Sequence, residues 1–169
     1  QTIMLKSKFS LFFFSALISL TFLYSCKKDN SASEGTKWSI DAFNFSSDKK
    51  AGVMLETDTA TLFGASTTSK DAILLLFKKR PSAGMYYVVN TQVKTNVSMY
   101  EDNECSMIIT NKTGGVVIYL PLTDDAGTVD ISVSGKKITA SFSNVNLGYI
   151  DPSSGDLVPS LASGTIIEK

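Results

Sequence analysis

Residues 129–145 have the sequence VDISVSGKKITASFSNV, and this stretch decides the fold class. In its second half the apolar residues Ile138, Ala140 and Phe142 alternate with polar residues, which is the period of a strand with one buried face. A β-rich run at 129–133 precedes it, and the Ser134-Gly135-Lys136 segment between them is typical of a tight hairpin turn. The stretch therefore predicts two antiparallel strands.

The same kind of pattern continues on both sides of this hairpin. Short runs rich in Val, Ile, Thr, Phe and Tyr are separated by Gly, Asp, Asn, Ser and Pro, without a sustained helical period. The predicted strands cover residues 37–45, 52–56, 60–65, 73–77, 85–89, 105–109, 116–120, 129–133, 137–145 and 164–168. About nine or ten short strands predict an all-β fold, a single antiparallel β-sandwich or flattened barrel over residues 37–169.

The first of these runs, residues 37–45, is predicted to be one extended strand. Side chains alternate between the two faces of a strand, so Trp38 and Ile40 would lie on one face and Phe43 and Phe45 on the other.

The run Ile73–Phe77 is apolar at every position. Such a run is either a central strand covered on both sides or a short buried helix, and its length favours the strand. Residues 91–102 have weak patterning and leave open a loop or a distorted edge strand.

Composition excludes several kinds of chemistry. The chain of 169 residues has no His, so it has no Ser-His-Asp or Cys-His pair and no imidazole ligand for a metal. Its 2 Cys cannot form a four-thiolate site. The 16 basic and 16 acidic residues argue against a nucleic-acid partner, which usually requires a basic patch. No cofactor is expected.

The N-terminal segment has the layout of a secretory signal peptide. Lys6 and Lys8 precede an almost unbroken apolar run at 9–24, which is shorter than the roughly 20 residues of a permanent membrane span. We therefore expect residues 1–25 to be cleaved. Met4 lies just before the basic residues, so residues 1–3 are interpreted as upstream of the natural start.

The end of this run, Leu23-Tyr24-Ser25-Cys26, resembles the bacterial lipobox. The resemblance implies that the Cys26 thiol receives a diacylglyceryl group, that signal peptidase II cuts before Cys26, and that the chain is anchored to a membrane through Cys26. More than one acyl chain makes such an anchor stable. The alternatives are an ordinary signal peptide with a chance Cys and a short uncleaved anchor.

Cleavage before Cys26 would leave a tether and one domain. Removing Lys6 and Lys8 leaves 14 basic against 16 acidic residues, a net charge of −2. Residues 26–36 contain the lipidated Cys and the segment KKDNSASEGT, which is typical of a flexible linker. Cys105 would then have no disulfide partner, and its β-rich surroundings favour a small buried apolar residue over a reactive thiol.

The chain as a whole resembles small β-rich lipoproteins of the Bacteroidota, a family of uncharacterised function. The likeness rests on Lys27-Lys28-Asp29 after the lipobox Cys, Trp38-Ser39-Ile40-Asp41-Ala42, the segment PSAGMYYVV at 81–89 and the segment VSGKKITASFSNV at 133–145. The resemblance implies a location in the cell envelope, at the outer membrane in a leaflet that it leaves open, and a β-sandwich fold. It carries over no catalytic residue.

Asp58-Thr59-Ala60 is similar to the acceptor pattern for O-glycosylation of exported proteins in that phylum. In this interpretation Thr59 carries the glycan. The alternative is that Thr59 only begins a strand.

Acidic side chains are grouped at 101–104, at 124–125, and at Asp151 and Asp156. Such groups could bind calcium or, as a pair of carboxylates, hydrolyse a glycosidic bond. None has the EF-hand spacing, and Asp favours solvated turns for local reasons, so turns are the favoured interpretation.

The candidates for a ligand platform are aromatic residues, with Trp38, Tyr86 and Tyr87 foremost; the others are Tyr100, Tyr119 and Tyr149. Adjacent Tyr86 and Tyr87 must point to opposite faces of a strand, so one of them belongs in the core. Trp38 near the start of a sandwich is more often core than platform.

The sequence therefore predicts a lipid-anchored, non-enzymatic envelope module that acts in a structural, accessory or binding role. Its partner would be an envelope protein or a glycan. The alternatives are a carbohydrate- or small-ligand-binding lipoprotein that uses exposed aromatics, and a carboxylate- or metal-dependent hydrolase.

Overall fold

The computed structural model describes residues 35–47, 52–56, 59–66, 70–112 and 116–169. Residues 35–169 form one compact unit, and its described part is built from strands with one short 3-10 helix, η1 (Val97–Met99). The strands are β1 (Lys37–Ile40), β2 (Phe43–Ser46), β3 (Gly52–Glu56), β4 (Thr59–Ala65), β5 (Ala72–Phe77), β6 (Gly84–Val88), β7 (Glu104–Asn111), β8 (Val117–Tyr119), β9 (Thr128–Ser134), β10 (Lys137–Ile150) and β11 (Leu157–Ile167). The predicted all-β class is confirmed.

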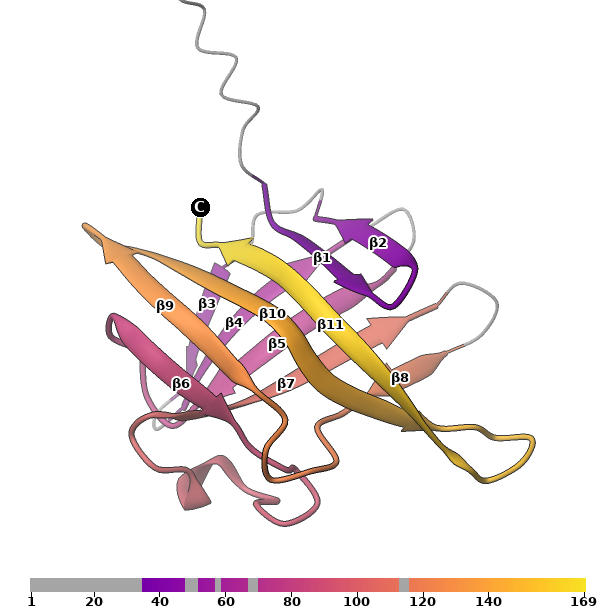
Figure 1. Cartoon of the computed structure of the whole chain (residues 1–169). Coiled ribbons are helices and arrows are strands. Elements are labelled where there is room, and N and C mark those ends of the chain that lie inside the picture. The colour runs from indigo at the N-terminus through magenta and orange to yellow at the C-terminus, as the bar shows by residue number, and fades with distance from the viewer. Residues whose placement is uncertain (1–34, 48–51, 57–58, 67–69, 113–115) are drawn as a thin grey trace, which may run out of the picture. The chain divides into compact units, whose positions relative to one another are not determined.

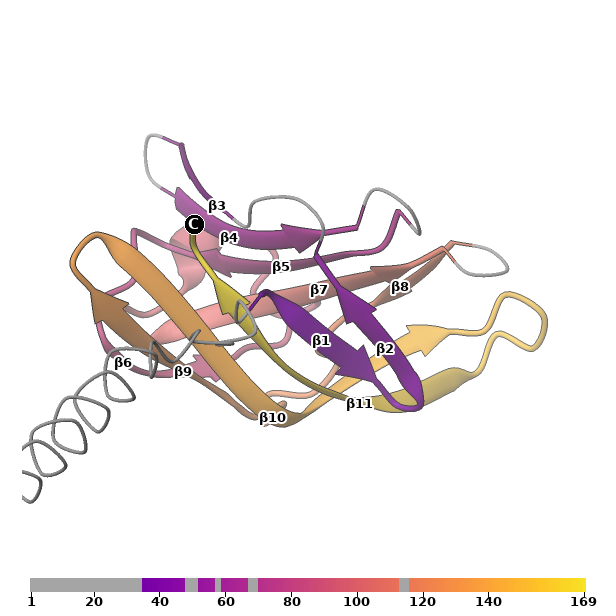
Figure 2. The same ribbon diagram turned by 90° about the horizontal axis from the view of Figure 1, so that it is seen from above.

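All of these strands belong to one strongly curved sheet (Figure 1). Their order is β2-β1-β11-β10-β9-β6-β7-β5-β4-β3, and β8 pairs with β7 beside this path. The pairs are antiparallel except for β6 and β7, which are parallel. An isolated bridge between Leu120 and Gly148 connects the chain after β8 back to β10, so that the sheet is nearly closed, like a flattened barrel. Figure 2 shows β3, β4 and β5 on one side and β9, β10 and β11 on the other.

The hairpin at 129–145 forms as predicted. β9 pairs with β10 from Ser134↔Lys137 to Val129↔Phe142, and Gly135 takes a positive φ of 62° at the turn. Ile138, Ala140 and Phe142 point into the core, together with Val129 and Ile131. The alternating pattern places these side chains on the same buried face, which is where the hydrophobic effect stabilises the fold.

Strands β10 and β11 are longer than predicted. β10 continues to Ile150, and β11 begins at Leu157 instead of residue 164. A bulge between Phe142 and Val145 shifts the register, and Asn144 has a positive φ of 53° there. The extra residue puts Phe142 and Val145 on the same side and breaks the simple alternation.

The prediction of one strand at 37–45 is wrong. The chain turns back at Asp41, where φ is 49°, and forms the hairpin β1–β2. Trp38 pairs directly with Phe45 across it, and the two rings stack with centroids 5.6 Å apart, so they share one face instead of lying on opposite faces. The turn is held from outside, since the Leu161 N–H donates to Asp41 Oδ1 at 2.8 Å and the Asp41 N–H donates to the Leu161 carbonyl at 2.9 Å.

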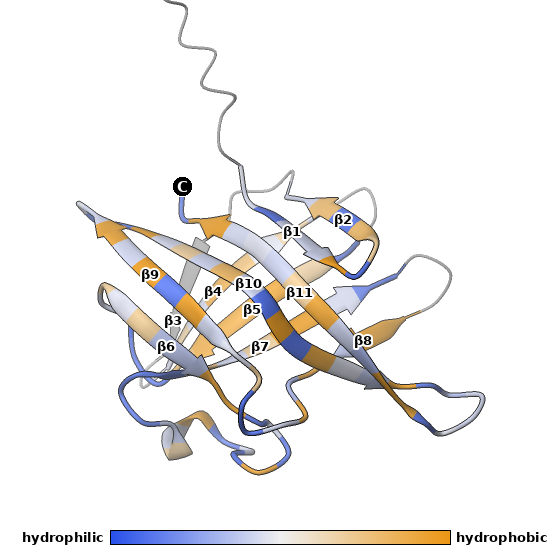
Figure 3. Ribbon diagram, in the orientation of Figure 1, coloured by the Kyte–Doolittle hydropathy of each residue, from blue (hydrophilic) through white to orange (hydrophobic). Residues whose placement is uncertain are grey.

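The apolar run at 73–77 is strand β5, which lies between β4 and β7 within the sheet. Its position inside the sheet is as predicted, but its two faces differ. Ile73, Leu75 and Phe77 are fully buried, whereas Leu74 and Leu76 are only half-buried. Full cover on both sides is therefore not found. Figure 3 shows that β5 and β8 are hydrophobic along most of their length.

The undecided stretch 91–102 is a loop that contains η1. Of the predicted turns, the corner at 57–58 and residues 113–115 lie outside the described residues.

We predict that Gly164→Ala destabilises the domain. A Cβ at this position would lie 2.6 Å from the Lys37 carbonyl oxygen and 2.8 Å from Trp38 Cα, both of them backbone atoms of the neighbouring strand β1. Overpacking of this kind costs about 1–3 kcal/mol, which urea denaturation should reveal as a lower free energy of unfolding. Ser141→Ala, on the exposed face of β10, is the control. Equal stability of both variants would contradict the close packing of β1 on β11.

Candidate functional site

A groove opens where β8 and β10 separate. The two segments are joined at Leu120 and Gly148, each of which donates its N–H to the carbonyl of the other at 2.9 Å. This bridge is isolated, so the ladder does not continue to Ile118 and Ile150. Those two side chains are 50% and 56% exposed, a high value for large apolar residues. The diverging strands thus leave apolar side chains along an open space.

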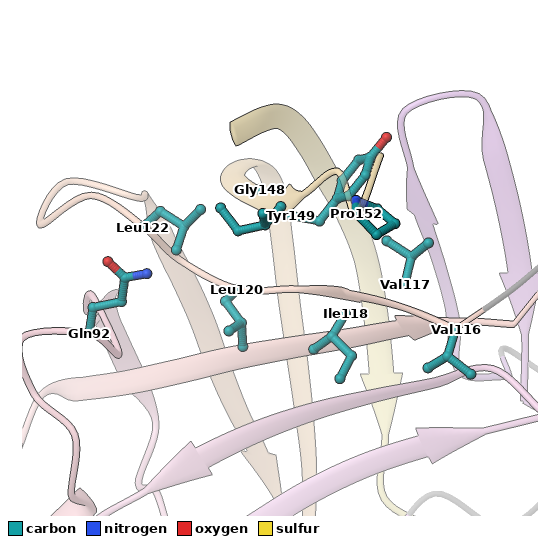
Figure 4. A pocket seen from close by; sticks show the side chains of 10 residues that line it. Gln92, Val116, Val117, Ile118, Leu120, Leu122, Gly148, Tyr149 and Pro152 are labelled. Carbon is teal, nitrogen blue, oxygen red and sulfur yellow. The ribbon is translucent and has the colours of Figure 1, made fainter. Parts of the chain in front are cut away.

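The walls of this space are almost entirely apolar (Figure 4). Its volume is about 300 Å³, at the lower end of the range for small-molecule sites. One side is formed by Val116, Val117, Ile118, Leu120 and Leu122, the other by Gly148, Tyr149, Ile150 and Pro152, and Gln92 stands at the end near Leu122. Gln92 contributes an amide, which can donate and accept hydrogen bonds.

A second hollow of about 230 Å³ adjoins the first along the β10–β11 hairpin. It shares Leu122 and Gly148 with the first and adds Leu157 and Pro159 among its walls. A Cβ on Gly148 would lie 2.9 Å from the Cδ1 atoms of both Leu122 and Leu157, so glycine is what lets these side chains approach the strand. We call the two hollows together the apolar groove.

Two tyrosines, Tyr119 of β8 and Tyr149 of β10, are in contact next to the bridge. The rings of Tyr119 and Tyr149 meet edge to face with centroids 5.2 Å apart. Burial raises the pKa of Tyr119, and the neighbouring Tyr149 and Asp41 raise it further. The Tyr119 hydroxyl therefore stays neutral at physiological pH.

The loop that carries Gln92 is fixed to the groove by hydrogen bonds. The buried Asn90 side chain donates from Nδ2 to the Leu122 carbonyl at 3.0 Å and accepts the Gln92 N–H at Oδ1 at 2.9 Å. The Thr91 N–H also donates to the Pro121 carbonyl at 3.3 Å. These hydrogen bonds fix the position of Gln92 relative to Leu122, which favours a preformed site.

An ion pair connects the same loop to the first residue of β7. Lys94 Nζ lies 2.7 Å from Glu104 Oε1, and the Glu101 N–H donates to Glu104 Oε2 at 2.7 Å. Burial raises the pKa of Glu104, but the hydrogen bonds from Lys94 and from the Glu101 backbone lower it by more, so its pKa is below the usual value. The ionised carboxylate therefore stabilises this loop.

The three aromatic residues predicted as a ligand platform do not come together on one surface. Trp38 and Tyr86 are 2% and 6% exposed and belong to the core, where Tyr86 meets Phe77 edge to face. Only Tyr87 is exposed, at 48%. The expectation that Tyr86 and Tyr87 point to opposite faces is confirmed, and the expected platform is corrected because Trp38 and Tyr86 fill the core.

The acidic groups do not converge on a metal-binding arrangement. In the part of the chain that the structure describes, no group of three or more Cys, Asp or Glu side chains is placed to hold a metal ion. In the first acidic group, Asp102 pairs with Lys79 at 2.7 Å and Glu104 pairs with Lys94.

The remaining predicted residues are placed as follows. Cys26 lies outside the described residues. Thr59 is the first residue of β4 and is half-buried, which agrees with the strand-start interpretation, while its glycosylation stays a prediction. Cys105 is fully buried and has no disulfide partner among the residues that the structure describes. Burial raises the pKa of its thiol, and the nearby Glu104 raises it further, so Cys105 is a core residue and a poor nucleophile.

The groove itself was missed by sequence analysis. The run 116–120 is predicted to be a strand, and no strand is predicted for the residues at 147–150 and 157–159. The sequence does contain a clue, because the residues at 116–120 are apolar at every position. A strand with one buried face needs apolar residues only at alternate positions.

Comparison of the chain with models of known protein families, with curated proteins and with solved structures finds no match. Among the described residues, no helix is long and apolar enough to span a membrane.

We predict that Glu104→Gln destabilises the domain at neutral pH. Because the folded-state pKa of Glu104 is lowered, its stabilisation is present above the unfolded-state pKa and is lost as the pH falls through the folded-state pKa. We expect a loss of about 1 kcal/mol at pH 7 in the free energy of unfolding, with the wild type and the variant converging in acid.

Urea denaturation at pH 7 and at pH 3 measures this difference. Asp102→Asn is the control, because Asp102 belongs to an exposed ion pair on the same loop and should leave stability nearly unchanged. A loss for Glu104→Gln that is equal at both pH values would contradict the proposed role of the charge.

Proposed function

We propose that this chain is a lipid-anchored, non-enzymatic binding module of the bacterial cell envelope, held at the outer membrane through Cys26. The observation that carries the proposal is the position of Leu23-Tyr24-Ser25-Cys26 at the end of a short apolar run that follows two lysines. This arrangement resembles the lipobox, and the polar residues 27–36 after it suit a tether.

The binding role in this proposal belongs to the apolar groove. Its walls are apolar, its glycine at 148 makes room for two leucines, and hydrogen bonds fix the loop that carries Gln92. Concave apolar surfaces with few polar groups are typical of ligand sites. The partner that suits such walls is apolar rather than a sugar, which usually needs an exposed aromatic face.

We predict that Cys26→Ala abolishes membrane attachment. In a Bacteroidota host, the wild-type protein should lose residues 1–25, gain the mass of acyl chains at Cys26 and partition with membranes. The variant should show none of these three changes, because it has no thiol to receive the diacylglyceryl group. Intact-mass spectrometry and membrane fractionation measure them.

Cys105→Ala is the matched control. It removes the other thiol of the chain, which is buried in the core, and it should leave both acylation and partitioning as in the wild type. A wild-type protein that is secreted without acyl mass would overturn the proposed anchor.

A further inference from the structure

The two ends of the β10–β11 pair carry opposite charges. Lys136 and Lys137 stand at the turn where β10 begins, and both are exposed. Asp151 and Asp156 stand at the other end, in the turn that joins β10 to β11. Among the ion pairs of the described residues, none involves these four side chains. The strand pair is therefore positive at one end and negative at the other.

Arg80 belongs to the positive end. Its Nη2 atom donates to the Lys136 carbonyl at 2.6 Å and to Glu168 Oε2 at 2.8 Å. The same Glu168 oxygen accepts the Ile138 N–H at 3.0 Å, so Arg80, Glu168 and the start of β10 are held together. Glu168 balances the charge of Arg80, and the ammonium groups of Lys136 and Lys137 stay uncompensated.

The chain also enters the domain at this end. Thr36 Oγ1 accepts the N–H of Ile167, the last residue of β11, at 2.9 Å. Lys37 comes next, is exposed and makes no ion pair with the described residues. Figures 1 and 2 show the C-terminus between the start of β1 and the turn that joins β9 to β10. We call these cationic side chains together the basic end: Lys37, Arg80, Lys136 and Lys137.

We propose that the basic end docks on a lipid surface with negatively charged headgroups, so that the apolar groove faces away from the membrane. This proposal rests on the proposed anchor at Cys26 and adds the orientation of the anchored domain. Basic groups beside a membrane anchor are attracted to anionic headgroups over about a Debye length.

The length of the tether and the negative end both favour this orientation. At most about 30 Å of extended chain separates Cys26 from Gly35, so an anchor at Cys26 would keep the basic end within reach of the surface. The same surface repels Asp151 and Asp156 at the far end of the strand pair. Attraction at one end and repulsion at the other therefore select one orientation.

The test measures binding without the anchor, so that the headgroups alone hold the protein. The protein is the chain from residue 27 onward, which contains the whole compact unit at 35–169 and has 14 basic against 16 acidic residues. It is sedimented at low salt with vesicles of phosphatidylcholine alone, and with mixed vesicles in which about 30% of the lipid is phosphatidylglycerol. We expect binding to the mixed vesicles only, despite the negative net charge, and a loss of this binding in added salt.

Two double variants of equal net charge separate the basic end from charge in general. Lys136→Gln combined with Lys137→Gln should weaken binding to the mixed vesicles by more than about tenfold, because each basic group near the surface contributes about fivefold. Every variant keeps Lys27 and Lys28, and its amide spectrum verifies its fold.

Lys70→Gln combined with Lys112→Gln is the matched control and should bind as the wild type does. Both lysines are exposed, and they flank the start of β5 and the end of β7, which pair with each other. Arg80 follows the other end of β5, so the control lies away from the basic end.

Spin-labelled headgroups in the mixed vesicles report the orientation. They should broaden the amide signals of Gly135, Ile138 and Glu168 and spare those of Ile150 and Leu157. Broadening at Ile150 and Leu157 instead would mean that the apolar groove meets the membrane, and it would overturn the proposal.

Equal binding to both kinds of vesicle, or an equal loss in the two double variants, would also overturn the docking surface. Neither result touches the anchor, because acylation at Cys26 is measured separately. Conversely, a chain that is not acylated in its host but still binds the mixed vesicles would overturn the anchor and leave the basic end standing.

Discussion

The sheet depends on β10, which is paired on both of its edges. One edge pairs with β11 along nearly the whole strand, and the other pairs with β9 only as far as Phe142. Beyond the bulge, the Asn146 N–H donates to the Ala126 carbonyl at 2.6 Å, and Gly148 pairs with Leu120. Backbone groups on a strand edge need partners, so these contacts take over where β9 ends and draw the chain after β8 onto β10.

The closure of the sheet and the opening of the groove have the same cause. Because β10 and the chain after β8 meet at one bridge, they diverge on the side of Ile118 and Ile150. The rings of Tyr119 and Tyr149 meet edge to face beside the bridge, whereas the side chains of Ile118 and Ile150 stay 50% and 56% exposed. A concave apolar surface of this kind is costly to expose to water, which is why such patches usually mark a binding site.

Local patterns in the sequence predicted the strands but not their long-range contacts. The alternation at Ile138, Ala140 and Phe142 has period two, and it can be recognised from the local sequence alone. The turn at Asp41 has no such signature, because its hydrogen bonds come from Leu161, far along the chain. The bulge after Phe142 breaks the alternation, so the second half of β10 was missed. The groove depends on the meeting of Leu120 with Gly148, which no local pattern encodes. Tyr86 and Tyr87 show the limit of this kind of prediction. Alternation predicts that their side chains lie on opposite faces of β6, but it does not predict which of the two is exposed.

The position of the groove suits a tethered domain. The chain enters the domain at Gly35 and continues into β1, which pairs with residues 162–165 of β11. The groove includes Leu157 and Pro159 at the other end of the same strand. Leu157 and Thr165 are separated by about 26 Å, since a strand rises about 3.3 Å per residue. In the proposed lipoprotein, the tether and the ligand therefore use opposite ends of β11.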